Sequence, residues 1–88
     1  MIIKHYTITP NTTKTTLKVV EETQFLGINP RNDRDISLYA LTPEEGEIKD
    51  VNIYTFKTGE VEKFSGRYLG SVNLHKNVFT FHVFEEKS

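Results

Sequence analysis

The chain has no cysteine, and only three prolines and five glycines among its 88 residues. Without cysteine, neither a disulfide bond nor a thiolate metal site can stabilise the fold. A domain of this length buries only about 60–65% of the surface that its unfolded form exposes, so its core is thin. We therefore expect a single domain, residues 1–88, that needs no cofactor and gains stability from association with further copies, as a homo-oligomer.

An excess of either charge is also missing. Eleven Lys and Arg residues against 12 Asp and Glu give a formal net charge of -1. A non-specific nucleic-acid binder needs many cationic contacts with phosphates, so we do not expect nucleic acid as a partner. A small anionic ligand stays compatible with this balance, because it needs only a few donors.

Long apolar runs are absent as well. No run approaches the roughly 20 residues that span a bilayer, so we expect no membrane contact. The N-terminal stretch MIIKHYTITP lacks the apolar core and the small-residue cleavage site of a signal peptide. These features predict a cytoplasmic protein.

Alternation of apolar and polar residues dominates the chain, and this period is typical of β-strands. It predicts strands at 2–9, 15–20, 23–28, 35–42, 51–57, 67–74 and 77–85. Ile36, Leu38 and Ala40 are expected to face the core. No segment is long enough to form a stable helix. The sequence thus predicts an all-β domain, a small antiparallel sandwich or open barrel of five to seven strands.

The predicted connections are short and have the composition of turns. Pro, Asn and Asp interrupt the chain at 29–33, Gly46 lies in the loop 43–47, and TGE at 58–60 predicts a tight turn. The stretch 61–66 is expected to be irregular or the weak end of a strand. His75 and Lys76 form the predicted turn between the last two strands.

Complete catalytic motifs are missing. The three histidines, His5, His75 and His82, lack the spacing of a metal site. The acidic residues lie mostly in pairs typical of solvated surface, and no serine lies in a GxSxG elbow. No glycine-rich phosphate loop is present. We therefore do not expect an enzyme, although pairing of the terminal strands would bring His5 and His82 close enough for acid–base chemistry.

The arginines are the best candidates for ligand binding. Arg31 and Arg34 lie together in the loop PRNDR, and Arg67 follows Ser65 and Gly66. A guanidinium holds phosphate through two parallel hydrogen bonds. These residues predict a phosphate site. The alternative is that Arg31 and Arg34 form ordinary surface pairs with the neighbouring aspartates.

Aromatic residues are more numerous than one small core face requires. A ring left outside the core can stack on a nucleobase, and tyrosine suits this role because its hydroxyl stays in water. We assign stacking to Tyr39 and Tyr54 and polar contacts to Asn73 and His82. The alternative for His82 is a structural strand residue that is hydrogen-bonded within the sheet.

The C-terminal third carries a more specific pattern. The positions that form it are Tyr68, Leu69, Gly70, Ser71, Val72, Leu74, Phe81, His82, Val83, Phe84 and Glu85. This YLGSV…FHVFE pattern resembles the end of a family of small, mostly phage-encoded proteins of unassigned function. The stretch ISLYAL, 36–41, is similar to a strand of that family with Tyr39 in place of its usual Trp. YTFKTGE, 54–60, is similar to a family turn in which Glu60 replaces the usual His.

The resemblance covers residues 36–85 and implies a small all-β domain with no established catalytic residue. Its phage setting suggests, by analogy of class alone, an anti-defence protein that sequesters a nucleotide immune signal. The expected ligand is a cyclic ADP-ribose-like molecule or a cyclic dinucleotide, bound without cleavage in an infected bacterial host. Two other hypotheses stay open: a module that binds a host defence protein or serves as a virion accessory, and, less favoured, a nucleotide hydrolase.

Overall fold

The computed structural model describes residues 1–60 and 64–86, and within these ranges the chain forms seven β-strands and no helix. The strands are β1 (Ile2–Ile8), β2 (Lys14–Val20), β3 (Gln24–Pro30), β4 (Ile36–Thr42), β5 (Ile48–Lys57), β6 (Gly66–Leu74) and β7 (Phe79–Glu86). The predicted all-β class is confirmed, with the strand number at the upper end of the expected range. In the described part of the chain, no helix is long and apolar enough to cross a membrane.

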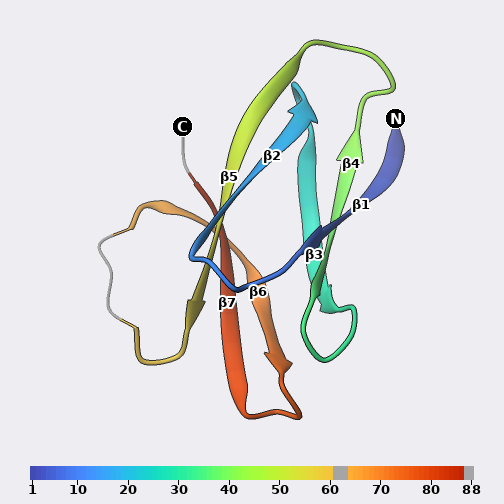
Figure 1. The fold of residues 1–88 in the computed structure, drawn as a ribbon. Helices are drawn as coiled ribbons and strands as arrows, with labels where there is room; N and C mark the ends of the chain where they lie inside the picture. The colour runs from blue at the N-terminus through green and yellow to red at the C-terminus, as the bar shows by residue number, and fades with distance from the viewer. Residues whose placement is uncertain (61–63, 87–88) are drawn as a thin grey trace.

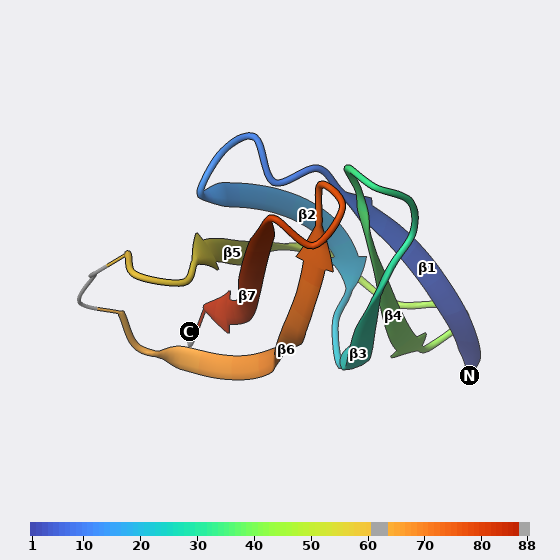
Figure 2. The ribbon, with the colours of Figure 1, turned by 90° about the horizontal axis from the view of Figure 1, so that it is seen from below.

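The strands form two antiparallel sheets that are not closed into a barrel. One sheet has the order β1-β4-β3 and the other the order β2-β5-β7-β6. Figures 1 and 2 show the two sheets beside each other, with the chain changing sheet between β1 and β2, between β2 and β3, and between β4 and β5. Strands β3 and β6, at the edges of their sheets, contact each other and close one side.

The core lies between the two sheets. Ile36, Leu38 and Ala40 on β4 are fully buried, which confirms their predicted orientation. They face Ile53 of β5 and Val83 of β7, which are also fully buried. Burial of an aliphatic side chain of this size contributes about 1.5–3 kcal/mol. The thin core therefore depends on a few residues from the central strands of each sheet.

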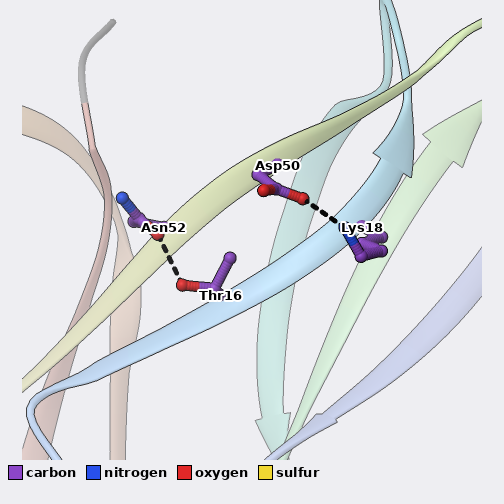
Figure 3. A network of polar contacts seen from close by, with 4 residues as sticks. All are labelled: Thr16, Lys18, Asp50 and Asn52. Carbon is purple, nitrogen blue, oxygen red and sulfur yellow. Dashed lines mark hydrogen bonds and ion pairs between the residues drawn. The ribbon is translucent and has the colours of Figure 1, made fainter.

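Two polar pairs fix the register of the edge strand β2 against β5. Lys18 lies opposite Asp50, with Nζ 3.0 Å from Oδ1, and the hydroxyl of Thr16 donates to Oδ1 of Asn52 at 2.7 Å. Figure 3 shows both pairs on the outward face of these strands. Exposed pairs of this kind each contribute about 0.2–1 kcal/mol. They specify which face of β2 is turned to solvent.

The observed boundaries differ from the predicted ones in a few places. β3 continues through Asn29 to Pro30, where a break was expected, because an edge strand can end on a residue that lacks an N–H group. β5 begins at Ile48 rather than at 51. Of the predicted irregular stretch 61–66, residues 61–63 lie outside the described residues, and β6 begins at Gly66.

Candidate functional site

An aromatic cluster covers the outer face of the four-stranded sheet. Its members are Tyr54 and Phe56 of β5, Phe64, Tyr68 of β6, and His82 and Phe84 of β7. The register explains the cluster, because Tyr54 and Tyr68 both pair with Phe84, and Phe56 pairs with His82. The intervening residues of β5 and β7 point into the core. One sheet therefore carries apolar side chains on both faces.

Phe64 folds over this face from the segment that precedes β6. Its ring centroid lies 4.5 Å from that of Tyr54, 5.7 Å from Phe56 and 5.6 Å from Phe84. A hollow of about 330 Å³ opens beside it, which we call the aromatic cleft. Its lining residues are Phe56, Lys57, Thr58, Gly59, Glu60, Phe64, His82 and Phe84. Three ring faces and a few polar groups suit a planar, partly polar ligand.

His82 connects the wall of the aromatic cleft to its rim. Its Nε2 lies 2.7 Å from the hydroxyl of Thr58. The backbone N–H of Lys57 donates to the Glu60 carboxylate, which orients that side chain across the tight turn predicted at 58–60. The cleft thus has an imidazole, a hydroxyl and a carboxylate at its edge. These groups can bind hydroxyls or exocyclic amines of a ligand.

Two further hollows continue from the aromatic cleft around the same end of the sandwich. The middle hollow, of about 190 Å³, shares Lys57 and Glu60 with the cleft, and it shares Pro10 and Asn11 with the end hollow. The end hollow, also of about 190 Å³, is lined by Thr9, Pro10, Asn11, Arg34 and His75. The shared residues make the three hollows neighbours, and we call this row of hollows the track; the cleft lies on the outer face of the four-stranded sheet, whereas Thr55 and Phe81 of the middle hollow belong to its inner face. An aromatic wall lies at one end of this track and a cationic group at the other.

The end hollow is bordered by two connections that lie at the same end of the molecule, the β3–β4 loop and the β6–β7 turn (Figure 1). In the loop, Oδ1 of Asn32 accepts the backbone N–H groups of Arg34 and Asp35 at 2.7 and 2.8 Å. This closed turn is a common use of asparagine. It sets the direction in which the backbone presents Arg34.

Asp33 attaches that loop to the β6–β7 turn. Its carbonyl oxygen accepts the N–H of His75 at 2.9 Å, and its carboxylate accepts the N–H of Lys76 at 2.6 Å. His75, Lys76 and Asn77 all have positive φ, at 54°, 56° and 66°. A residue such as lysine costs about 1–2 kcal/mol in this left-handed region, whereas asparagine tolerates it. The bonds from Asp33 hold a strained turn in place.

The negative charges at this end are engaged within the protein. Asp35 accepts hydrogen bonds from the hydroxyl of Thr9 at 2.7 Å and from the side-chain amide of Asn32 at 3.1 Å. These bonds, and secondarily the nearby charges of Arg31 and Arg34, hold the pKa of Asp35 below its ordinary value. Among the described residues, neither arginine lies within ion-pair distance of a carboxylate, so the expected surface pairs do not form.

The predicted site residues fall into separate groups. Tyr54, His82 and Asn73 share the outer face of the four-stranded sheet, although Asn73 lies at the far end of β6 and accepts a hydrogen bond from Thr80. Tyr54 also donates to the Glu86 carboxylate at 3.3 Å. The structure thus brings Tyr54 and His82 into one aromatic cluster, in which His82 lines the cleft.

The predicted arginines and Tyr39 lie elsewhere. Arg67 pairs with Glu85 at 3.8 Å, on the strand position that alternates with Tyr68. Arg31 reaches Nε2 of His5 at 3.3 Å, and the His5 ring lies 5.6 Å from Tyr39 on the three-stranded sheet. Arg34 alone of the three lines the track.

His5 and His82, whose approach the sequence left open, belong to different sheets. His5 contacts the hydroxyl of Ser37 at 2.9 Å, whereas His82 contacts Thr58. The described residues bring together no group of three or more side chains that could hold a metal ion.

Of the residues that line the track, sequence reasoning singled out only Arg34 and His82, and Phe64 and His75 are the two most informative of those it missed. Phe64 lies in a stretch without strand alternation, so only the number of aromatic residues pointed to it. His75 was expected to be a solvated turn residue; it is exposed, but its ring lies 5.6 Å from that of Phe79 and lines the end hollow. Its proximity to Arg34 depends on the bonds of Asp33, which no local pattern reveals.

Comparison with known protein families gives a match over the whole chain. A family model described as "Domain of unknown function (DUF7352)" matches residues 1–88, the whole chain. No curated protein and no solved structure matches the chain.

Proposed function

The chain belongs to the DUF7352 family, and we propose that it is a non-catalytic binding protein for a nucleotide-derived signal. The observation that carries this proposal is the track of three neighbouring hollows, with the aromatic cleft at one end and Arg34 with His75 at the other. A nucleotide has the same division, because its base offers a flat apolar face and its phosphates are anionic.

In the proposed complex the base lies in the aromatic cleft against Phe64 and Phe84. Base–aromatic stacking contributes about 1–3 kcal/mol per base and accepts any base. The Glu60 carboxylate, which lines both the cleft and the middle hollow, accepts hydrogen bonds from sugar hydroxyls there, and Lys57 lines the same two hollows. The phosphates then lie at Arg34, so the order of groups along the ligand is base, sugar, phosphate.

The biological role that we propose is sequestration. The protein would bind the signal stoichiometrically in the cytoplasm of an infected bacterium and leave it intact, as an anti-defence protein of phage type. A cyclic ADP-ribose-like molecule is the first candidate and a cyclic dinucleotide the second. Association of several copies would raise the number of sites per particle without changing the chemistry of each.

Native mass spectrometry tests this proposal directly. The protein is measured alone and after mixing with cyclic ADP-ribose isomers, ADP-ribose and cyclic dinucleotides. A complex that carries the mass of an intact nucleotide supports the proposal and gives the number of copies. New product masses indicate a hydrolase instead. A protein mass without added nucleotide across the whole panel refutes the proposal.

Variants locate the site once a ligand is found. Arg34→Ala should weaken binding by about 1.5–3 kcal/mol, the scale of a hydrogen bond to a charged group. Phe84→Ala should weaken it by about 1–3 kcal/mol through loss of stacking. Lys18→Ala is the control, because it removes one exposed cation on β2, which does not line the track. Equal affinity of Arg34→Ala and Lys18→Ala would exclude Arg34 from the site.

A second candidate function is binding of another protein, either a host defence protein or a virion component. The observation that favours it is the edge strand β1, at whose start Ile2 and Ile3 are 41% and 68% exposed, next to Met1 at 65%. An edge strand with exposed apolar residues offers backbone pairing to an extended segment of a partner. Isolation of a host protein with the native chain, but not with an Ile3→Lys variant, would favour this function if no nucleotide binds.

A further inference from the structure

The β6–β7 turn passes through the left-handed region without the glycine that hairpin turns usually place there. His75, Lys76 and Asn77 are consecutive residues in the left-handed region, and none of them is glycine. Within the turn, the N–H of Val78 donates to the carbonyl of His75 at 3.1 Å. Strained backbone of this kind persists only where its surroundings hold it, and it is concentrated at functional sites.

Asp33 holds the strained turn in place. Its carbonyl oxygen and its carboxylate accept the N–H groups of His75 and Lys76, so one residue holds both. Arg34 follows Asp33 directly in the chain, and Arg34 and His75 line the same hollow. The contacts that maintain the strained turn therefore also set the spacing between Arg34 and His75.

We propose that Arg34 and His75 form a subsite for a phosphate or pyrophosphate group, and that Asp33 is the positioning residue that assembles it. This inference rests on the proposed function and names the part of the ligand that the end hollow recognises. A guanidinium and an imidazole N–H offer donors from two sides, which suits an anion with oxygens in several directions. The ligand class is one with a phosphate group that is accessible from the end of the molecule.

The inference predicts two opposite effects of Asp33 on anion binding, one from its charge and one from its hydrogen bond. The carboxylate is negative and lies beside the proposed anion site, so removal of its charge alone should strengthen anion binding. Its hydrogen bond to Lys76 holds the turn, so removal of that bond should weaken anion binding. Asp33→Asn removes the charge but keeps an acceptor oxygen, whereas Asp33→Ala removes both.

The test is isothermal titration of the full chain with inorganic pyrophosphate and with ADP-ribose, at fixed low salt. Asp33→Ala should bind both probes about tenfold more weakly, and Asp33→Asn should bind them at least as tightly as the native chain. If Asp33→Ala binds as tightly as Asp33→Asn or the native chain, Asp33 does not position the subsite. Circular dichroism establishes that each variant is folded before titration.

A pair of double variants separates positioning from general loss of stability. Asp33→Ala with Lys76→Gly replaces a strained residue by one that accepts the left-handed region freely, whereas Asp33→Ala with Lys76→Ala does not. Both lose the same side-chain charges. The glycine variant should bind pyrophosphate several-fold more tightly than the alanine variant. Equal affinities would show that the shape of the turn does not control the subsite.

The outcomes also separate this inference from the proposed function. If the native chain binds neither pyrophosphate nor any nucleotide, both are refuted. If it binds a nucleotide with an affinity that Phe84→Ala lowers, while Arg34→Ala, His75→Ala and Asp33→Ala leave it unchanged, the proposed function stands. In that case the ligand is held at the aromatic cleft alone, and the inferred anion subsite is refuted.

Discussion

Gly66 offers the sharpest test of the aromatic cleft, because a methyl group added there would clash with both the Phe64 ring and the backbone of Glu85. A Cβ atom at Gly66 would lie 2.5 Å from the carbonyl oxygen of Glu85 and against the ring of Phe64. Atoms this close cannot coexist without a shift. The Glu85 oxygen belongs to the backbone of the neighbouring strand β7, so the Phe64 ring is the easier of the two to displace.

The expected loss in the free energy of unfolding follows from these contacts. Forcing a methyl group into a filled site costs about 1–3 kcal/mol. Displacement of Phe64 also removes its contacts with Tyr54, Phe56 and Phe84, and each aromatic pair contributes about 0.5–1.5 kcal/mol. Because a displaced ring relieves part of the clash, we take both terms near their lower ends, and Gly66→Ala should destabilise the protein by about 3 kcal/mol. In a domain of this size that loss lowers Tm by about 12–24 °C.

Thermal and urea unfolding measure this loss, and Gly27→Ala is the matched control. Gly27 also lies in a strand, but a Cβ added there meets no atom within 4 Å. That variant should stay within about 0.5 kcal/mol of the native chain. In the proposed complex, Gly66→Ala should also weaken nucleotide binding, because a wall of the cleft has moved. If Gly66→Ala and Gly27→Ala unfold at the same temperature, Phe64 does not pack as described.

Three further predictions concern the core, the strained turn and the loss of stability at acid pH. Leu38→Ala should lower the free energy of unfolding, measured with urea, by about 2–5 kcal/mol, because Leu38 is fully buried. Leu26→Ala is the control: its side chain is 53% exposed, and the loss should stay under about 0.5 kcal/mol. Similar losses in both variants would contradict the assigned core. Lys76→Gly should raise the free energy of unfolding by about 0.5–1 kcal/mol, because glycine relieves the left-handed strain. Lys76→Ala should give no such gain. A gain in both variants would show that loss of the lysine charge, and not relief of strain, stabilises the protein. The lowered pKa of Asp35 means that its contribution to stability is complete above the ordinary value of 3.8 and is lost as the pH falls through the lowered value. Asp35→Asn should therefore show a smaller fall in Tm between about pH 5 and pH 2 than the native chain. The same fall in Tm in both proteins would refute the assigned hydrogen bonds.

The strands were predictable because alternation with period two is a local property. Ile36, Leu38 and Ala40 mark the buried face of β4 in the sequence, and the structure confirms it. Boundaries were less predictable where an edge strand tolerates an unusual residue, as β3 does at Pro30. The partner of each strand was not predictable, because β2 pairs with β5 through contacts such as Lys18 with Asp50, which are distant in the sequence.

The candidate site was less accessible to sequence reasoning than the fold. Tyr54 was chosen because a tyrosine ring can stack while its hydroxyl stays in water, and His82 was chosen as a polar contact. Their place on one face follows from the pairing of β5 with β7, which the sequence did not predict. The importance of Phe64 depends on how the segment before β6 folds back, and that of His75 depends on Asp33. Both are tertiary contacts without a local signal. Arg31 and Arg34 are near neighbours in the sequence, yet only Arg34 lines the track, because Arg31 extends toward His5.

The pairing of the strands also sets the order in which the chain can fold. β1 pairs with β4 and β2 with β5, so the first 20 residues find their partners only after the chain has reached Thr42 and then Lys57. During synthesis the N-terminal strands emerge first and stay unpaired, while the β3–β4 and β6–β7 hairpins close locally. Such non-local pairing slows folding. Ile2, Ile3 and Tyr6 are then exposed on a nascent strand, so the start of the chain is where chaperone binding or aggregation would begin.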